Sequence, residues 1–200
     1  MILYHMSDTV KVGDSLVPDH KGNRFLAEPF VKALHTGTGQ FLTLLLNAEY
    51  FGAVLAKYGL SGMPTHEIKW ATEGIFEFVR RKEFPEQCGR LQSNYFYPDR
   101  KLCRELYEED WGGASEEERA KIKLFEVEVE GRLTSYDMRL FDAAFDHLYD
   151  HSAAEDVEHC KELARKYFRG EKGDTPVMEI LDDGKAVAVR ELEIEFAPKQ

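Results

Sequence analysis

The sequence has few of the features that mark secreted, membrane-spanning or disulfide-stabilised proteins. Its 200 residues include only three cysteines, Cys88, Cys103 and Cys160, which lie far apart and form no C-x-x-C pair. An odd number of scattered cysteines argues against a disulfide framework and favours a reducing compartment. The longest apolar stretch, residues 41–46, is far too short to cross a bilayer. The first residues turn polar too soon for the apolar segment of a signal peptide, so we expect a soluble cytoplasmic protein.

Basic residues are also in the minority. The chain has 37 acidic against 26 basic residues, a formal net charge of −11. This balance argues against a protein that holds nucleic acid through bulk electrostatics, although a small basic pocket for an anionic cofactor remains compatible with it. Hydrophobic residues make up 43% of the chain, which is enough for a sizeable core. We therefore expect one folded domain.

Strand patterns lie at the start, middle and end of the chain, with helical patterns between them. The predicted strands are residues 2–6, a short segment before Pro18, and residues 90–97, 123–130, 177–181 and 186–196. The predicted helices are residues 28–58 with a break near Gly37, and residues 65–82, 99–109, 138–149 and 155–168. This order is neither a regular βαβ series nor all-β, and it predicts an α+β fold.

Turn and capping signals delimit these elements. Residues 19–23 are rich in turn formers and predict a loop. Ser115 with Glu118, and Ser152 with Glu155, have the spacing of capping boxes. The Asp-Gly pair at residues 183–184 separates two apolar runs, which predicts a β-hairpin.

Several familiar site motifs are missing. No G-x-G-x-x-G follows a strand, so a Rossmann dinucleotide site is not indicated. His147 and His151 are spaced i, i+4 on a predicted helix, with His159 and Cys160 downstream, and such spacing can bind zinc. The H-E-x-x-H signature is absent, and a solvated helix face explains the spacing as well. We assign no metal ligand and keep a metal hydrolase only as a weaker alternative.

Two polar residues in predicted strands are candidates for chemistry. His5 lies in an apolar strand beside Tyr4. It is either a partly buried histidine with a backbone partner or a group that binds a ligand hydroxyl. Alternation places Glu179 on the face opposite Met178 and Ile180. Glu179 is either a solvent-exposed edge carboxylate or a cleft residue that stabilises a cationic transition state.

The predicted strand 90–97 adds a third candidate. Alternation places Ser93 and Tyr95 on one side of it and Arg90 on the other. Tyr95 either stacks on a planar ligand ring or fills the core as an amphipathic aromatic residue. Phe96 and Tyr97 compete with Tyr95 as the stacking group.

These segments resemble parts of ADP-ribosyltransferases. Leu-Tyr-His-Met at residues 3–6 and Lys-Val-Gly-Asp-Ser-Leu at residues 11–16 resemble the opening of rifampin ADP-ribosyltransferases, where a strand Tyr-His precedes a G-D-x-L turn. Residues 90–97 and the helix after them resemble the middle strand and helix of those enzymes. Met-Glu-Ile-Leu at residues 178–181 resembles the catalytic-glutamate strand of DNA-targeting ADP-ribosyltransferase toxins and poly(ADP-ribose) polymerases. Taken whole, the chain also resembles a bacterial and phage family of unknown function.

The resemblance implies a fold and a substrate. The fold would be an ADP-ribosyltransferase-like split mixed sheet with a helical lobe. It would form a single domain over residues 1–200, with a helical insertion at about 28–82. NAD would be the substrate, and its nicotinamide N-glycosidic bond would break through an oxocarbenium-like transition state. ADP-ribose would pass to an unidentified acceptor, a protein, a nucleic acid or water, in a setting of toxin action or phage–bacterium conflict.

The resemblance also implies roles for individual residues. His5 would bind a ribose of NAD, Tyr95 would stack on the nicotinamide, and Glu179 would hold the 2′-hydroxyl of the nicotinamide ribose. Other residues of the NAD-binding set would be Tyr4, Ser93, Asn23 and Arg24, the last two near the phosphates or the adenine-side ribose.

Two departures from the family pattern qualify these roles. Arginine-specific transferases carry a second Glu two residues before the catalytic one, where this chain has Val177, so arginine is a less favoured acceptor. Glu191 and Glu193 in the last strand are rival carboxylates, and a shifted register would give Glu191 the role of Glu179. The alternative function is a catalytically inactive module of the same fold that binds a nucleotide or a protein.

Overall fold

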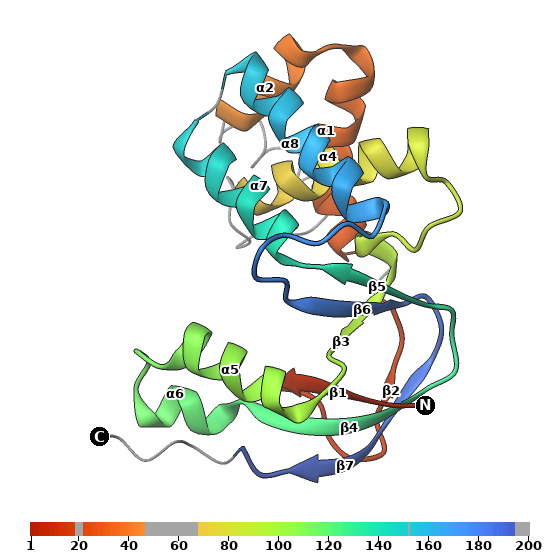
Figure 1. Ribbon diagram of the computed structural model, residues 1–200, viewed down its shortest axis with the longest axis vertical. Helices are drawn as coiled ribbons and strands as arrows, with labels where there is room; N and C mark the ends of the chain where they lie inside the picture. The colour runs from red at the N-terminus through yellow and green to blue at the C-terminus, as the bar shows by residue number, and fades with distance from the viewer. Residues whose placement is uncertain (19–21, 47–67, 152, 195–200) are drawn as a thin grey trace. The chain divides into compact units, whose positions relative to one another are not determined.

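The chain has an α+β fold that divides into two compact units. A computed structural model describes residues 1–18, 22–46, 68–151 and 153–194 (Figure 1). Unit 1 comprises residues 1–18, 93–135 and 177–200, and unit 2 comprises residues 19–92 and 136–176. The described parts of residues 28–82 lie in unit 2. A single domain with an insertion at 28–82 stays a prediction.

Unit 1 contains two β-sheets and two helices. Its strands are β1 (Ile2–Ser7), β2 (Ser15–Leu16), β3 (Asn94–Phe96), β4 (Lys123–Val129), β5 (Leu133–Asp137), β6 (Met178–Asp182) and β7 (Ala186–Leu192). Its helices are α5 (Arg100–Trp111), which packs against β1, and α6 (Glu116–Lys121). The strand order is β1-β4-β7-β2 in one sheet and β3-β6-β5 in the other. The chain passes from unit 1 into unit 2 within β5.

The core of unit 1 follows from side-chain alternation along β4. Phe125, Val127 and Val129 are buried on one face of the four-stranded sheet and pack with Leu3 and Phe96. Glu128, which alternates with them, is exposed. The strand predicted at 123–130 is therefore confirmed as β4, with one face in the core.

The predicted hairpin at residues 183–184 is wrong. β6 pairs with β3, whereas β7 pairs with β4 and β2 in the other sheet. The bend at Gly184 lies directly against the bend at Gly131 between β4 and β5. A Cβ on Gly131 would stand 1.8 Å from Asp182 Oδ1 and 2.5 Å from the Gly184 nitrogen. At these two bends the chain passes from one sheet to the other, between β4 and β5 and between β6 and β7. Bends of this kind commonly form the corners between packed sheets.

Unit 2 is built from helices. They are α1 (Gly22–Thr36), α2 (Thr38–Leu46), α4 (Ile68–Glu83), the 3₁₀ turn η1 (Arg90–Gln92), α7 (Arg139–Asp150) and α8 (Ala154–Phe168). Helix α4 packs against α1, α7 and α8. Its residues 70–79 are all buried, as expected for a helix surrounded by others. At Gly74 a Cβ would come within 2.6 Å of Phe30 Cβ, so glycine permits the close approach of α1 and α4.

Most predicted helix boundaries are close to the observed ones. Gly37, with a φ of +136°, separates α1 from α2 as expected. The helix at 65–82 corresponds to α4, although residues 65–67 lie outside the described part of the chain, as do 47–58 of the earlier helix. The predicted end of the loop at residues 19–23 is wrong, because Gly22 and Asn23 already belong to α1. Residues 19–21 are outside the described ranges.

The two predicted capping boxes have different outcomes. In the first, Ser115 Oγ accepts from the Glu118 nitrogen at 3.3 Å, and the Ser115 nitrogen donates to Glu118 Oε2 at 3.0 Å. In the second, Asp156 rather than Glu155 is the acceptor, with its Oδ2 2.8 Å from the Ala153 nitrogen. Ser152 lies outside the described residues. The first box is confirmed. At the start of α8 only the bond from the Ala153 backbone to the Asp156 carboxylate is present, because the alanine side chain has no oxygen to accept a hydrogen bond.

The strand predicted at 90–97 is also shorter than expected. Residues 90–92 form η1, in which the Gln92 nitrogen donates to the Gly89 carbonyl at 3.0 Å, and only residues 94–96 form β3. The strand alternation that related Arg90 to Tyr95 therefore does not apply. No helix in the described ranges is both long and apolar enough to span a membrane.

Candidate functional site

His5 links the two sheets of unit 1. It lies in β1 opposite Phe125 of β4, and its Nδ1 is 3.0 Å from the carbonyl oxygen of Tyr95 in β3. The His5 ring also meets the Phe96 ring edge-on, with 5.8 Å between the ring centres. Next to it, Tyr4 and Tyr97 exchange two backbone hydrogen bonds of 3.0 and 2.8 Å. The predicted backbone partner of His5 is thus found, and it is Tyr95.

The hydrogen bond defines how His5 can interact with a ligand. A carbonyl oxygen only accepts, so Nδ1 carries the proton and Nε2 of the neutral ring presents a lone pair. Burial lowers the pKa of His5, and its hydrogen bond with the Tyr95 carbonyl only partly opposes this effect. The neutral ring is therefore favoured near pH 7. Its Nε2 is suited to accept a hydrogen bond from a hydroxyl group.

The β3–β6 register places Tyr95 and Glu179 on one face of the three-stranded sheet. Tyr95 lies opposite Leu181, and Phe96 lies opposite Ile180. Directly opposed residues share a face and neighbours along a strand alternate, so Glu179 is on the face of Leu181 and Tyr95. Ile180 packs against the core of unit 1 on the other face, as the alternation of residues 178–180 predicted. Tyr95 and Glu179 are diagonal neighbours, for which the spacing is roughly 7–8 Å.

The sequence left two environments open for Glu179, a solvent-exposed sheet edge and a cleft. The structure excludes the solvent-exposed edge. Glu179 lies in β6, the central strand of its sheet, and only 4% of its surface is exposed. A glutamate this deeply buried is uncommon, because removing a carboxylate from water is costly unless it is compensated. The rival residue Glu191 is exposed on β7 in the other sheet, opposite Phe125. The structure therefore separates the two carboxylates by environment.

The remaining predicted NAD-binding residues fall in both units. Ser93 is buried immediately before β3, and Tyr4 is half-buried in β1, both in unit 1. Asn23 and Arg24 lie in the first turns of α1 in unit 2, with Arg24 exposed. The structure thus brings the His5 ring to the backbone of Tyr95 through a hydrogen bond. The register of β3 and β6 places Tyr95 and Glu179 on one face of their sheet. The roles of all seven residues in binding NAD stay predictions.

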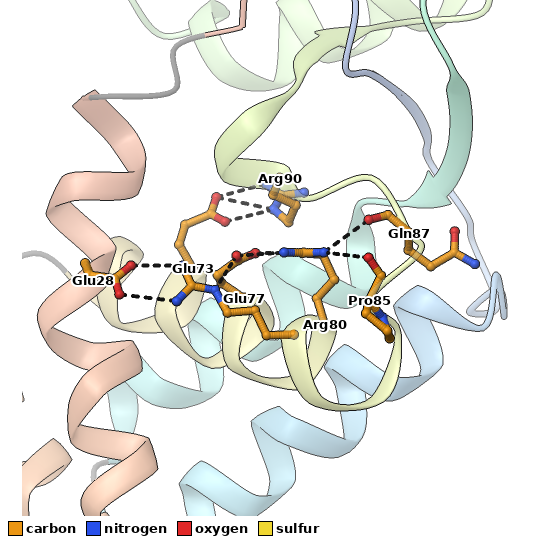
Figure 2. Close-up of polar contacts among 8 residues, drawn as sticks. Glu28, Glu73, Glu77, Arg80, Pro85, Gln87 and Arg90 are labelled. Atoms are coloured by element: carbon orange, nitrogen blue, oxygen red, sulfur yellow. Dashed lines mark hydrogen bonds and ion pairs between the residues drawn. The ribbon is translucent and has the colours of Figure 1, made fainter.

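Arg90 belongs to a buried polar network in unit 2 that the sequence analysis missed (Figure 2). Its Nε lies 3.2 and 3.1 Å from the two carboxylate oxygens of Glu73, and its Nη1 donates to the Tyr167 hydroxyl at 3.2 Å. The guanidinium also stands 3.9 Å from the centre of the Phe141 ring. Both charged partners are buried. Arg90 is therefore engaged within unit 2.

A second carboxylate, one turn further along α4, has a cluster of arginine partners of its own. Glu77 accepts from Arg80 Nε at 2.8 Å and from Arg81 Nε at 2.7 Å, and Arg81 Nη2 continues to Glu28 at 2.9 Å (Figure 2). Burial alone would raise the pKa of Glu77, but the two arginines outweigh it and hold the pKa below its usual range. Arg80 also donates to the carbonyls of Pro85 and Gln87, at 3.3 Å each.

Both groups of ion pairs have the character of structural elements. Buried charges are tolerated when each is paired and hydrogen-bonded, and the buried carboxylates of Glu73 and Glu77 are both paired with arginines. A sequence signal for both existed. Glu73 and Glu77 are spaced i, i+4 inside a helical run whose other members are largely apolar.

The cysteines offer no activated nucleophile. Cys88, Cys103 and Cys160 are all buried free thiols. Burial raises the pKa of Cys103 and of Cys160 to about 12. A thiol with such a pKa is almost entirely protonated near neutral pH and therefore a poor nucleophile. Their burial is the placement expected of free cysteines that fill space in an apolar core.

The comparison with protein families covers nearly the whole chain. Residues 3–194 match the family described as "Protein of unknown function (DUF2441)". The chain belongs to the DUF2441 family. No curated protein matches the chain.

Proposed function

We propose that this DUF2441 protein cleaves NAD and transfers ADP-ribose, using the β1–β3–β6 region of unit 1. The observation that carries the proposal is the connection of three residues on β1 and on the paired strands β3 and β6. The His5 imidazole is bonded to the Tyr95 carbonyl, and Tyr95 shares a sheet face with the buried carboxylate of Glu179. The proposal includes the ADP-ribosyltransferase-like fold, in which a strand histidine, an aromatic residue and a strand glutamate follow one another in the same order.

In the proposed reaction, the bond between nicotinamide and its ribose breaks first. Nicotinamide leaves with the bonding electrons as a neutral molecule, so no proton has to be supplied to it. The ribose carbon becomes an oxocarbenium-like cation, which the Glu179 carboxylate stabilises while accepting a hydrogen bond from the 2′-hydroxyl. An acceptor nucleophile then forms a bond to this carbon and releases a proton.

The burial of Glu179 favours this role on electrostatic grounds. A carboxylate removed from bulk water interacts more strongly with a developing positive charge than an exposed carboxylate does. His5 Nε2 would accept a hydrogen bond from a second ribose hydroxyl, and the Tyr95 ring would stack on nicotinamide. The exposed carboxylate of Glu191 lacks this environment, which favours Glu179 among the two candidates.

The experiment is label transfer from NAD carrying a radioactive adenylate phosphate to macromolecules of a cell lysate. The native chain should label one or more acceptors, and Glu179→Gln should reduce the labelling at least roughly 100-fold. Glu191→Gln is the matched control, because it removes an exposed carboxylate from the neighbouring sheet, and it should label as the native chain does. Equal labelling by the native chain and Glu179→Gln would contradict the proposal.

A catalytically inactive module of the same fold is the alternative. It predicts no labelling by any of the three proteins. It also predicts that a nucleotide raises the melting temperature of both the native chain and Glu179→Gln, because ligand binding to the native state raises stability.

A further inference from the structure

Three consecutive residues in and directly after β3 contact β1 at His5. The Tyr95 carbonyl oxygen lies 3.0 Å from His5 Nδ1, and the Phe96 ring meets the His5 ring at an angle of 73° between their planes. Tyr97 exchanges two backbone hydrogen bonds with Tyr4, the residue before His5. The same short segment therefore fixes both the backbone next to His5 and its imidazole ring.

Phe96 differs from its two neighbours because its side chain, and not its backbone, makes the contact. Its surface is 0% exposed, and its ring belongs to the core of unit 1 together with Leu3 and Phe125. His5 is half-buried, so part of its surface remains accessible. A phenyl ring buried this completely is placed to shape the surroundings of His5 rather than to stack on a ligand.

The charge state of His5 depends on this apolar contact. Burial lowers the pKa of His5, and the hydrogen bond with the Tyr95 carbonyl opposes that effect. Apolar surroundings disfavour the protonated ring, because they replace the water that would solvate its charge. A protonated imidazole donates from both nitrogens and has no lone pair left to accept a hydrogen bond.

Charged side chains near β1 lie away from this contact. By strand alternation, Lys123 and Glu191 are on the face of His5, and both are exposed. In α5, which packs against β1, Arg100 acts on Glu126, and Glu126 lies on the opposite face of the sheet. The residues of β3 bring no charged side chain. Burial is therefore the main influence on His5.

We propose that Phe96 is a positioning residue for His5. Its ring keeps water from the imidazole and holds it so that Nε2 of the neutral ring accepts a hydrogen bond from a ribose hydroxyl. The identity of this hydroxyl rests on the proposed function, whereas the effect of Phe96 on His5 belongs to the chain without any ligand. The two can therefore be tested apart.

The first test is a nuclear magnetic resonance titration of the imidazole signals of the full chain without NAD, between about pH 5 and 8. The His5 signals are those missing from His5→Asn. Phe96→Leu and Phe96→Met both remove the aromatic ring and keep an apolar side chain. Both should raise the pKa of His5, so that its titration midpoint moves to higher pH by more than the uncertainty of the fit.

Val129→Ala is the matched control. Val129 belongs to the same core, but its nitrogen bonds to the Met1 carbonyl at 3.1 Å, four residues before His5. This variant loosens the core away from His5 and should keep the native midpoint. Near-UV circular dichroism shows which variants retain the native packing. An unchanged midpoint in the folded Phe96 variants, or an equal shift in Val129→Ala, would overturn the proposal.

The second test measures nicotinamide release at increasing NAD concentration. Phe96→Leu should raise KM roughly 2–10-fold, which corresponds to the loss of one hydrogen bond, and should change kcat less. An unchanged KM in an active Phe96→Leu protein would overturn the positioning role. Absence of release by the native chain would contradict the proposed function, while the titration without NAD still decides whether Phe96 controls His5.

Discussion

At the scale of single residues, the two ring nitrogens of His5 differ in their partners. Its Nδ1 is used by the Tyr95 carbonyl, whereas its Nε2 has no hydrogen-bond partner among the described residues. An asparagine at this position can keep a donor near Nδ1 but has no equivalent of the Nε2 lone pair. A structural role of His5 and its proposed role in binding NAD can therefore be separated by mutation.

We expect His5→Asn to weaken NAD binding while leaving the fold largely intact. Its free energy of unfolding should lie within about 1 kcal/mol of the native value, and His5→Ala should lose about 1 kcal/mol more, because it also removes the bond to Tyr95. Urea denaturation measures the stabilities, and titration calorimetry with NAD measures the binding. If His5→Asn binds NAD as tightly as the native chain, His5 is a structural residue only.

The lowered pKa of His5 also predicts a pH dependence of stability. Below about pH 6.5 the unfolded chain takes up a proton on His5, while the folded chain keeps the ring neutral. Protons then favour the unfolded state, so stability falls as the pH drops. Between pH 7.5 and 5.5 the native chain should lose up to about 1 kcal/mol more than His5→Asn, measured by urea denaturation. Equal losses in both proteins would show that His5 becomes charged in the folded state.

At the scale of secondary-structure elements, α4 depends on its buried ion pairs. Arg90→Met would leave the Glu73 carboxylate buried without its main partner, which costs about 3–5 kcal/mol in comparable cases. Replacing both residues, as Arg90→Met with Glu73→Met, removes the uncompensated charge. We expect the double variant to be more stable than Arg90→Met alone in urea denaturation. A double variant that is less stable than the single one would show that Glu73 finds another partner.

The corner between the two sheets of unit 1 gives a steric prediction. A methyl group at Gly131 would overlap Asp182 Oδ1 and stand 2.7 Å from Gly184 Cα. Gly131→Ala should therefore destabilise the chain by about 1–3 kcal/mol or more, the usual cost of overpacking. Gly113→Ala is the matched control, because a Cβ there meets nothing within 4 Å. Melting temperatures of the two variants test this. A similar melting temperature for Gly131→Ala and the native chain would contradict the described corner.

The sequence predicted elements better than it predicted their pairing. A short apolar run identified β1, and alternation identified β4 and the face of Glu179, because these patterns are local. The Asp-Gly signal correctly indicated a bend at Gly184, but a bend does not determine which strands pair, and β6 and β7 joined different sheets. The conformation of residues 90–92 was missed for a related reason. Arg90 is held by Glu73, seventeen residues away, and strand periodicity contains no information about such a contact.

The same distinction applies to the candidate sites. Spacing on one helix predicted that His147 and His151 are neighbours. The approach of His159 depends on how α8 packs on α7, and the bond from His147 to Asp156 depends on it too. Likewise, the exposure of Glu191 and the burial of Glu179 follow from the sheet to which each strand belongs. Burial and long-range packing are the features of the candidate sites that a local sequence pattern does not determine.

At the scale of the whole molecule, the residues of the proposed NAD chemistry lie in one unit. His5, Tyr95 and Glu179 belong to unit 1, whereas the exposed His159 lies in α8 of unit 2. We expect His159→Gln to leave the rate of nicotinamide release from NAD unchanged, because it changes an exposed side chain outside unit 1. A slower rate for His159→Gln would show that NAD cleavage also depends on unit 2.

The most direct measurement is the release of nicotinamide from NAD by the purified chain, followed by mass spectrometry with and without cell lysate. The native chain and Glu191→Gln should release nicotinamide at similar rates, and Glu179→Gln should be slower by at least roughly 100-fold. Absence of release by the native chain in both conditions, or equal release by Glu179→Gln, would contradict NAD cleavage at Glu179.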